Sequence, residues 1–117
     1  MRLRGFVSLL FFVCIAAFYP AYAQKIVNQF EAPGGTPRGL AWDGTHLWCA
    51  DERANAIYKL NPSTGSIVSS ISFSIESGKG GLTWSSDGNL WIANGLLVHK
   101  VDPNTGDPLG TVQCPGS

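Results

Sequence analysis

The sequence lacks an excess of either charge, because eight lysines and arginines balance eight aspartates and glutamates among its 117 residues. Nucleic acids and anionic membranes attract proteins through surplus positive charge, so neither is an expected partner. Histidine is scarce as well, and neither His46 nor His99 stands at metal-ligand spacing from a cysteine or a carboxylate. We therefore expect no metal and no cofactor, and we interpret the two histidines as parts of a turn and of a strand.

The sequence also has no G-x-S-x-G elbow, P-loop, H-E-x-x-H motif or EF-hand loop, so no catalytic constellation is visible in it. No segment shows a 3.6-residue hydrophobic period, which excludes a helical solenoid. Fourteen glycines and seven prolines instead imply many turns, and 11% aromatic residues imply a packed core. This composition is typical of an all-β protein.

A repeat with a period of about 41 to 43 residues dominates what is present. The segment Gly39–Gly65 reads GLAWDGTHLWCADERANAIYKLNPSTG, and Gly81–Gly106 repeats it as GLTWSSDGNLWIANGLLVHKVDPNTG. Both segments carry an aromatic pair and end on a Pro-x-Thr-Gly turn, whose glycine supplies the left-handed exit of a hairpin. The turns in each unit are therefore spaced as in a four-stranded antiparallel meander, which is the structure of one β-propeller blade.

The pattern predicts four strands in each blade. They are Gly39–Trp42, Leu47–Ala50, Ala56–Leu60, Ile67–Phe73, Gly81–Trp84, Leu90–Ala93, Leu97–Val101 and Leu109–Gln113. An additional leading strand is expected over Ile26–Phe30, because residues 30–34 align with residues 112–116, two periods later. The predicted fold class is all-β, with two propeller-type blades in residues 24–117 and an incomplete ring.

The repeat GLAWDGTHLWCADE…IYKLNPSTG resembles the blades of secreted bacterial propellers of the NHL and streptogramin-lyase-like type. It is also similar to the repeats of propeller-type glutaminyl-peptide cyclotransferases. The resemblance implies a propeller fold over Lys25–Gly116 and leaves the activity open. We expect an exported module with a binding or scaffold role, which belongs to a larger ring. The alternative is the N-terminal part of a propeller enzyme of either type, with catalytic residues outside this chain.

Residues 1–23 contain, in sequence, the charged, apolar and cleavage segments of an export signal. Arg2 and Arg4 precede the uncharged run Phe6–Phe18, and Pro20 stands ahead of the cleavage pattern Ala21–Ala23. A membrane anchor is the competing interpretation, but the apolar run is shorter than the roughly 20 residues that a spanning helix needs. We therefore expect a secreted or periplasmic protein with no membrane attachment after cleavage.

Cys49 and Cys114 are the cysteines that cleavage would leave, and an oxidising compartment would permit a disulfide between them. Neither recurs in the other repeat, since Cys49 matches Ile92 and Cys114 matches Phe73. The sequence therefore favours a buried hydrophobic role for Cys49 over a disulfide.

Two sets of side chains are candidates for ligand binding. The repeated tryptophans Trp42, Trp48, Trp84 and Trp91 suit packing between blades, and the competing role is a stacking platform for a sugar or peptide. The second set stands on loops that enter a first strand or join a second strand to a third, which share one edge of a blade. Its members are Arg38, Asp51, Glu52, Arg53, Lys79 and Asn94.

The second set mixes cations, carboxylates and an amide, so we expect a polar or zwitterionic ligand, or a protein, at that edge. Changing Arg38 or Asp51 to alanine is expected to weaken this binding and to leave stability nearly unchanged. Solvated, partly paired surface charges are the competing interpretation. Two blades expose two apolar faces, so a homo-oligomer that completes a ring is a further expected partner.

The signal pattern predicts cleavage between Ala23 and Gln24 on export. Mass spectrometry of the exported protein is expected to give a chain that starts at Gln24, with or without cyclisation of that residue. Exported protein that retains residues 1–23 would contradict the interpretation.

Overall fold

The computed structural model describes residues 25–115, so the export signal expected at residues 1–23 lies outside the described part. These residues form eight strands and no helix, and thus include no helix long and apolar enough to cross a membrane. The strands are β1 (Pro37–Trp42), β2 (Leu47–Asp51), β3 (Ala56–Leu60), β4 (Ile67–Ser72), β5 (Gly81–Trp84), β6 (Leu90–Asn94), β7 (Leu97–Val101) and β8 (Pro108–Gln113).

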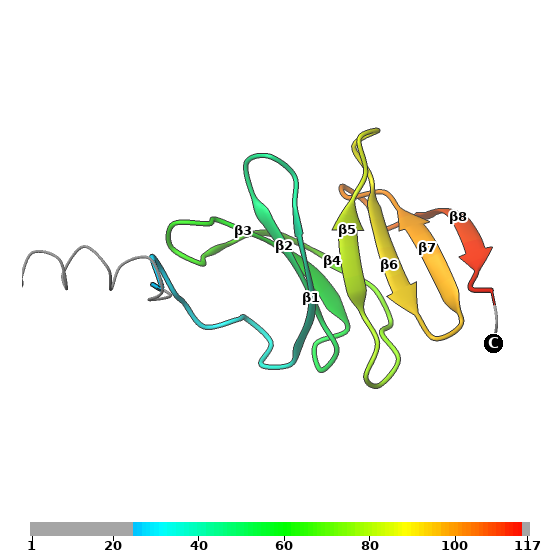
Figure 1. The fold of residues 1–117 in the computed structure, drawn as a ribbon, viewed down its shortest axis with the longest axis horizontal. Coiled ribbons are helices and arrows are strands. Elements are labelled where there is room, and N and C mark those ends of the chain that lie inside the picture. Colours follow the sequence, from blue (N-terminus) through cyan, green and yellow to red (C-terminus); the bar gives the residue numbers. More distant parts are fainter. Residues whose placement is uncertain (1–24, 116–117) are drawn as a thin grey trace, which may run out of the picture.

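The strands make two antiparallel four-stranded sheets, in the orders β1-β2-β3-β4 and β5-β6-β7-β8 (Figure 1). All eight strands of the expected meanders are present, within two residues of the predicted ends. The two sheets even share an irregularity, since the register between third and fourth strand shifts after Lys59 in one and after Lys100 in the other. The all-β prediction of two propeller-type blades is confirmed, and the sheets do not close into a ring.

The leading strand expected over Ile26–Phe30 is wrong, because residues 25–36 contain no strand. A strand needs a neighbour with unpaired backbone groups. In the described part, each sheet already has its own fourth strand, so the third strand of neither blade is open to this segment. The segment nevertheless lies beside the first sheet, where the Asn28 amide donates a hydrogen bond to the Ser63 carbonyl at 3.0 Å.

The two sheets pack face to face, and Trp48 and Trp84 lie at the centre of this contact. The Trp48 and Trp84 rings stack with centroids 5.8 Å apart and planes 21° from parallel. Trp48 is only 3% exposed, and Ala50 and Ile57 are buried beside it. The second sheet contributes Leu90 and Ile92 to the same core, with Leu82 and Trp84 packed against it.

A glycine allows the innermost strands to approach closely. A Cβ placed on Gly39 of β1 would overlap the carbonyl oxygen of Gly80 and lie 2.7 Å from the Leu82 nitrogen at the start of β5. No residue with a side chain fits there without moving one backbone. Glycine at position 39 is therefore required by the packing of the first blade against the second.

The predicted packing role holds for Trp48 and Trp84, which meet between the sheets. Their equivalents lie on the outer faces of the pair: Trp42 is 52% exposed and Trp91 is half-buried. Each repeat also places a lysine over the second-strand tryptophan, Lys59 at 5.6 Å from the Trp48 ring centre and Lys100 at 5.7 Å from that of Trp91. The tryptophan positions are equivalent in the repeat, and only their neighbours differ.

Trp48→Ala is expected to lower the free energy of unfolding by about 3–5 kcal/mol, because it empties the centre of the contact between sheets. Trp48→Phe retains an aromatic ring opposite Trp84 and should cost less. Urea denaturation followed by fluorescence measures both values. Val68→Ala, at a side chain that is 51% exposed, is the control and should change stability by no more than about 0.5 kcal/mol. Equal losses for Trp48→Ala and Val68→Ala would contradict this account.

Candidate functional site

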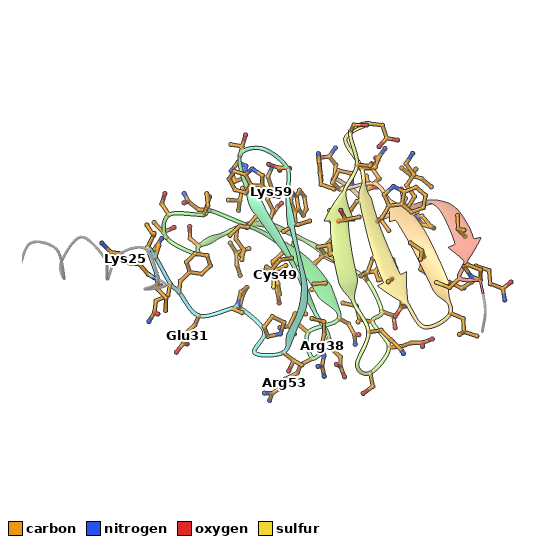
Figure 2. All side chains as sticks on the ribbon, viewed as in Figure 1. Lys25, Glu31, Arg38, Cys49, Arg53 and Lys59 are labelled. Carbon is orange, nitrogen blue, oxygen red and sulfur yellow. The ribbon has the colours of Figure 1, made fainter. Side chains whose placement is uncertain are left out.

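The six predicted site residues lie at one edge of the two sheets, which we call the entry rim. It comprises residues 34–38, 51–55, 74–80 and 94–97, where the chain enters a blade or passes from its second strand to its third. Figure 2 places Arg38 and Arg53 together at this edge. The six residues therefore share one rim, but their contacts differ: some hold loops in place and others line a cleft.

Asp51 is a structural residue of this rim. Its side chain is fully buried, and its carboxylate accepts hydrogen bonds from the backbone N–H groups of Thr36 at 2.8 Å and Ala54 at 2.9 Å. A Cβ on Gly34 would overlap the carboxylate, so the entering loop is also in close contact with it. This position differs from the expected one, because the Asp51 side chain faces both loops of the first blade rather than an open site, and we therefore expect it to contribute to stability.

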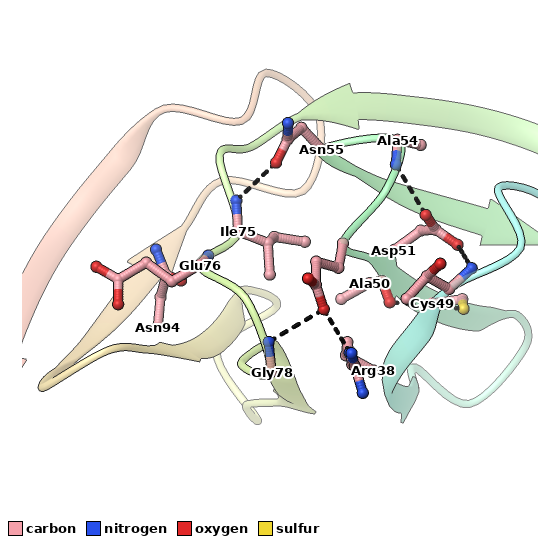
Figure 3. Close-up of polar contacts among 12 residues, drawn as sticks. Arg38, Cys49, Ala50, Asp51, Ala54, Asn55, Ile75, Glu76, Gly78 and Asn94 are labelled. Atoms are coloured by element: carbon pink, nitrogen blue, oxygen red, sulfur yellow. Dashed lines mark hydrogen bonds and ion pairs between the residues drawn. The ribbon is translucent and has the colours of Figure 1, made fainter.

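Asn94 holds the equivalent place in the second blade. Its side-chain oxygen accepts the Glu76 N–H at 2.7 Å, and its amide donates to the Ser74 carbonyl at 3.0 Å. The last residue of each second strand thus ties down the loop that enters its own blade (Figure 3). Both aspartate and asparagine suit this position, because each presents an oxygen acceptor to a backbone N–H.

Glu52 and Arg38 join the first blade to the loop that enters the second. The Arg38 Nε lies 2.6 Å from a Glu52 carboxylate oxygen, which also accepts the Gly78 N–H at 3.1 Å (Figure 3). The Gly78 N–H and the Arg38 guanidinium hold the pKa of Glu52 below its usual value. This pair is partly exposed, so its main effect is to position the loop rather than to stabilise the fold.

Lys79 and Asn94 line an open cleft of about 610 Å³ on the second blade. Its other lining residues are Glu76, Gly95, Leu96, Leu97 and Gln113. Arg53 is exposed and is not among the lining residues. The cleft volume lies in the range of small-molecule sites, and its lining mixes charges, amides and two leucines.

Sequence reasoning did not select Glu76, Gln113 or the two leucines. Glu76 was discoverable, since it stands in the same entering loop as Lys79. Gln113 pairs with Leu97, so the end of a fourth strand reaches the same rim as the start of a third strand. The position of Gln113 could have been predicted from the sequence, because neighbouring strands of a meander run in opposite directions and the end of one lies beside the start of the other.

The remaining polar candidates have structural roles. The His46 backbone N–H donates to Asp43 at 2.7 Å within a turn, and His99 lies 3.1 Å from the Thr111 hydroxyl and edge-on to Phe73. Cys49 is a buried thiol that is not bonded to Cys114, and its burial, with the nearby Asp51, raises its pKa. Within residues 25–115 no three His, Cys, Asp or Glu side chains gather closely enough to hold a metal ion.

No protein-family model matches the chain, and no curated protein matches it either. Solved structures do match. Myxococcus xanthus glutaminyl cyclase aligns with a TM-score of 0.55 and 22% identity, over 66% of this chain and 32% of that one. A streptogramin B lyase aligns with a TM-score of 0.53 and 22% identity, over 74% of this chain and 29% of that one.

A luciferin-regenerating enzyme aligns with a TM-score of 0.56 and 25% identity, over 75% of this chain. This chain spans 33% of that enzyme's length, and about a third or less of each of the three. The likeness concerns the arrangement of strands and blades, and it assigns no activity to this chain.

Asp51→Ala is expected to lower the free energy of unfolding by about 1–3 kcal/mol, because it leaves the N–H groups of Thr36 and Ala54 without their acceptor. Asp51→Asn should recover part of this loss, as Asn94 shows that an amide can serve at this position. Thermal and urea unfolding measure the effect. Arg53→Ala is the matched control on the same loop and should be nearly neutral; a loss no larger than the control's would show that the carboxylate is dispensable.

Proposed function

Because this chain is a β-propeller-like repeat protein whose two blades do not close a ring, we propose that it is an exported binding module. Its ligand is a short peptide or amino acid that carries both charges, and its site is the cleft on the second blade. The repeat arrangement supports a scaffold whose rim carries the binding groups, since scaffold positions recur between blades and site positions need not. The export signal pattern at residues 1–23 supports the localisation.

The observation that carries the proposal is a pair of opposite charges that line one cleft and form no ion pair among the described residues. The Glu76 carboxylate lies against Gly95, where a Cβ would overlap it. Within residues 25–115 the ion pairs are Arg38–Glu52 and Lys100–Asp87, so the side chains of Lys79 and Glu76 are left available. A cation and a carboxylate at one site complement the two ends of a zwitterion. Neutral ligands would leave both protein charges unmatched.

The rest of the lining suits a peptide better than an inorganic ion. Leu96 and Leu97 are 58% and 38% exposed, so an apolar ligand side chain would gain contact area there. The Gln113 amide can both donate to and accept from a peptide group. The ligand carboxylate would meet Lys79, its ammonium group would meet Glu76, and its side chain would cover the leucines.

Calorimetric titration of the mature chain with the dipeptide Leu-Leu tests the proposal. Lys79→Gln and Glu76→Gln should each weaken binding about tenfold or more, since a hydrogen bond to a charged group contributes about 1.5–3 kcal/mol. N-acetyl-Leu-Leu-amide, which has no charged ends, should bind at least as weakly as Leu-Leu binds to the variants. Arg53→Gln removes a rim cation outside the cleft and should have no effect.

Equal affinity for the charged and the blocked dipeptide would contradict the assignment of the charges. Mass spectrometry of the recovered ligand separates binding from catalysis. An unchanged dipeptide supports a binding module, and a converted one would favour the alternative of an enzyme part.

A further inference from the structure

The two outer faces of the sheet pair repeat the two halves of the contact that holds the pair together. The leading face is the outer face of the first sheet, and it consists of Leu40, Trp42, Leu47, Cys49 and Leu60. The trailing face is the outer face of the second sheet, and it consists of Gly81, Thr83, Trp91, Ala93, Val98 and Val112. Side chains alternate between the faces of a strand, so the pairing registers define both sets.

The leading face repeats the half that the second sheet contributes to the observed contact. Leu40 and Trp42 are equivalent to Leu82 and Trp84, which pack against the first sheet. In the leading face the same positions are 62% and 52% exposed. The pair of residues that packs between the sheets in the second blade therefore recurs on the leading face, where the described residues cover it only in part.

The trailing face repeats the other half. Its Ala93 is exposed, whereas the equivalent Ala50 is fully buried between the sheets. Val112 is 55% exposed, and its equivalent Ile71 is 7% exposed. A Cβ on Gly81 would meet only Ala93, at 3.7 Å, whereas one on the equivalent Gly39 would overlap the next blade. The close-approach glycine is therefore present on this face without its neighbour.

We propose that a second copy of this chain covers each face, with the trailing face of one copy packed on the leading face of the next. Trp91 of one copy then stacks on Trp42 of the other, as Trp48 stacks on Trp84 within the chain. The contact is heterologous, since two different surfaces meet, so copies add head to tail until a ring closes. The partner is a second copy because its trailing face repeats the half that already packs against Leu82 and Trp84.

The N-terminal segment competes with the incoming copy for the outer part of the leading face. The Phe30 ring packs against Gly65 so closely that a Cβ there would overlap it, and Ile71 approaches the equivalent Gly106 in the same way, at 3.3 Å from a Cβ. Phe30 and Ala32 also enclose an apolar cavity of about 200 Å³ against Leu40, Cys49 and other residues of the first sheet. Val112 of the incoming copy takes the place of Phe30, which leaves Gly65 on docking.

Sedimentation of the mature chain over a range of concentrations tests the proposal with one variant for each face. Trp42→Asp puts a charge on the leading face and Thr83→Arg puts one on the trailing face. Each should weaken self-association by at least about 30-fold, the effect typical of a residue central to an interface. Both positions are exposed, so each variant should melt like the wild type; if Trp42→Asp fails to fold, Leu40→Asp blocks the same face.

Mixing the two variants gives the decisive result. Each retains the face that the other lacks, so the mixture should form a one-to-one dimer, although neither variant associates alone. Phe30→Ala should strengthen self-association of the wild-type chain, because it removes the competing side chain. A wild-type chain that stays monomeric at high micromolar concentration, or two folded variants that fail to pair, would overturn the proposal.

Discussion

The contact between the two sheets is the constraint on which the rest of the structure depends. A single four-stranded sheet has two faces and cannot bury both, so neither blade has a core of its own. Stacking of Trp48 on Trp84, with β1 and β5 in backbone contact at Gly39, buries one face of each sheet. The same contact sets the distance between the blades, which lets Glu52 of the first blade reach Gly78 in the loop that enters the second.

The entry rim shows how polar residues divide between structure and recognition. Asp51 and Asn94 end equivalent strands and are occupied by backbone N–H groups, because buried loop backbone must find hydrogen-bond partners. Glu52 and Arg38 link the two blades. The charges that form no ion pair among the described residues stand on the loop that enters the second blade, at Glu76 and Lys79, and both side chains line the cleft.

Repetition has a second consequence, which concerns assembly. Each blade carries both halves of one type of contact, so the two described blades satisfy one contact between them and leave one half exposed on each outer face. The N-terminal segment covers part of one end, which explains why Cys49 and Leu60 are buried although they lie on an outer face. The proposed binding cleft and the two proposed packing faces consist of different residues.

The sequence by itself determined the strands, the turns and the blade repeat, because period-two patterning and Gly/Pro turns act locally. It also placed six residues on one rim, since strand direction alternates in a meander. Only the tertiary structure decided which of them are available. From the sequence, Asp51 and Lys79 are both expected to be charged loop residues. In the structure Asp51 is buried against a loop that contains Thr36, which lies 15 residues earlier in the chain. The missing strand at Ile26–Phe30 has the same cause: pairing depends on a neighbouring strand, which local sequence cannot specify.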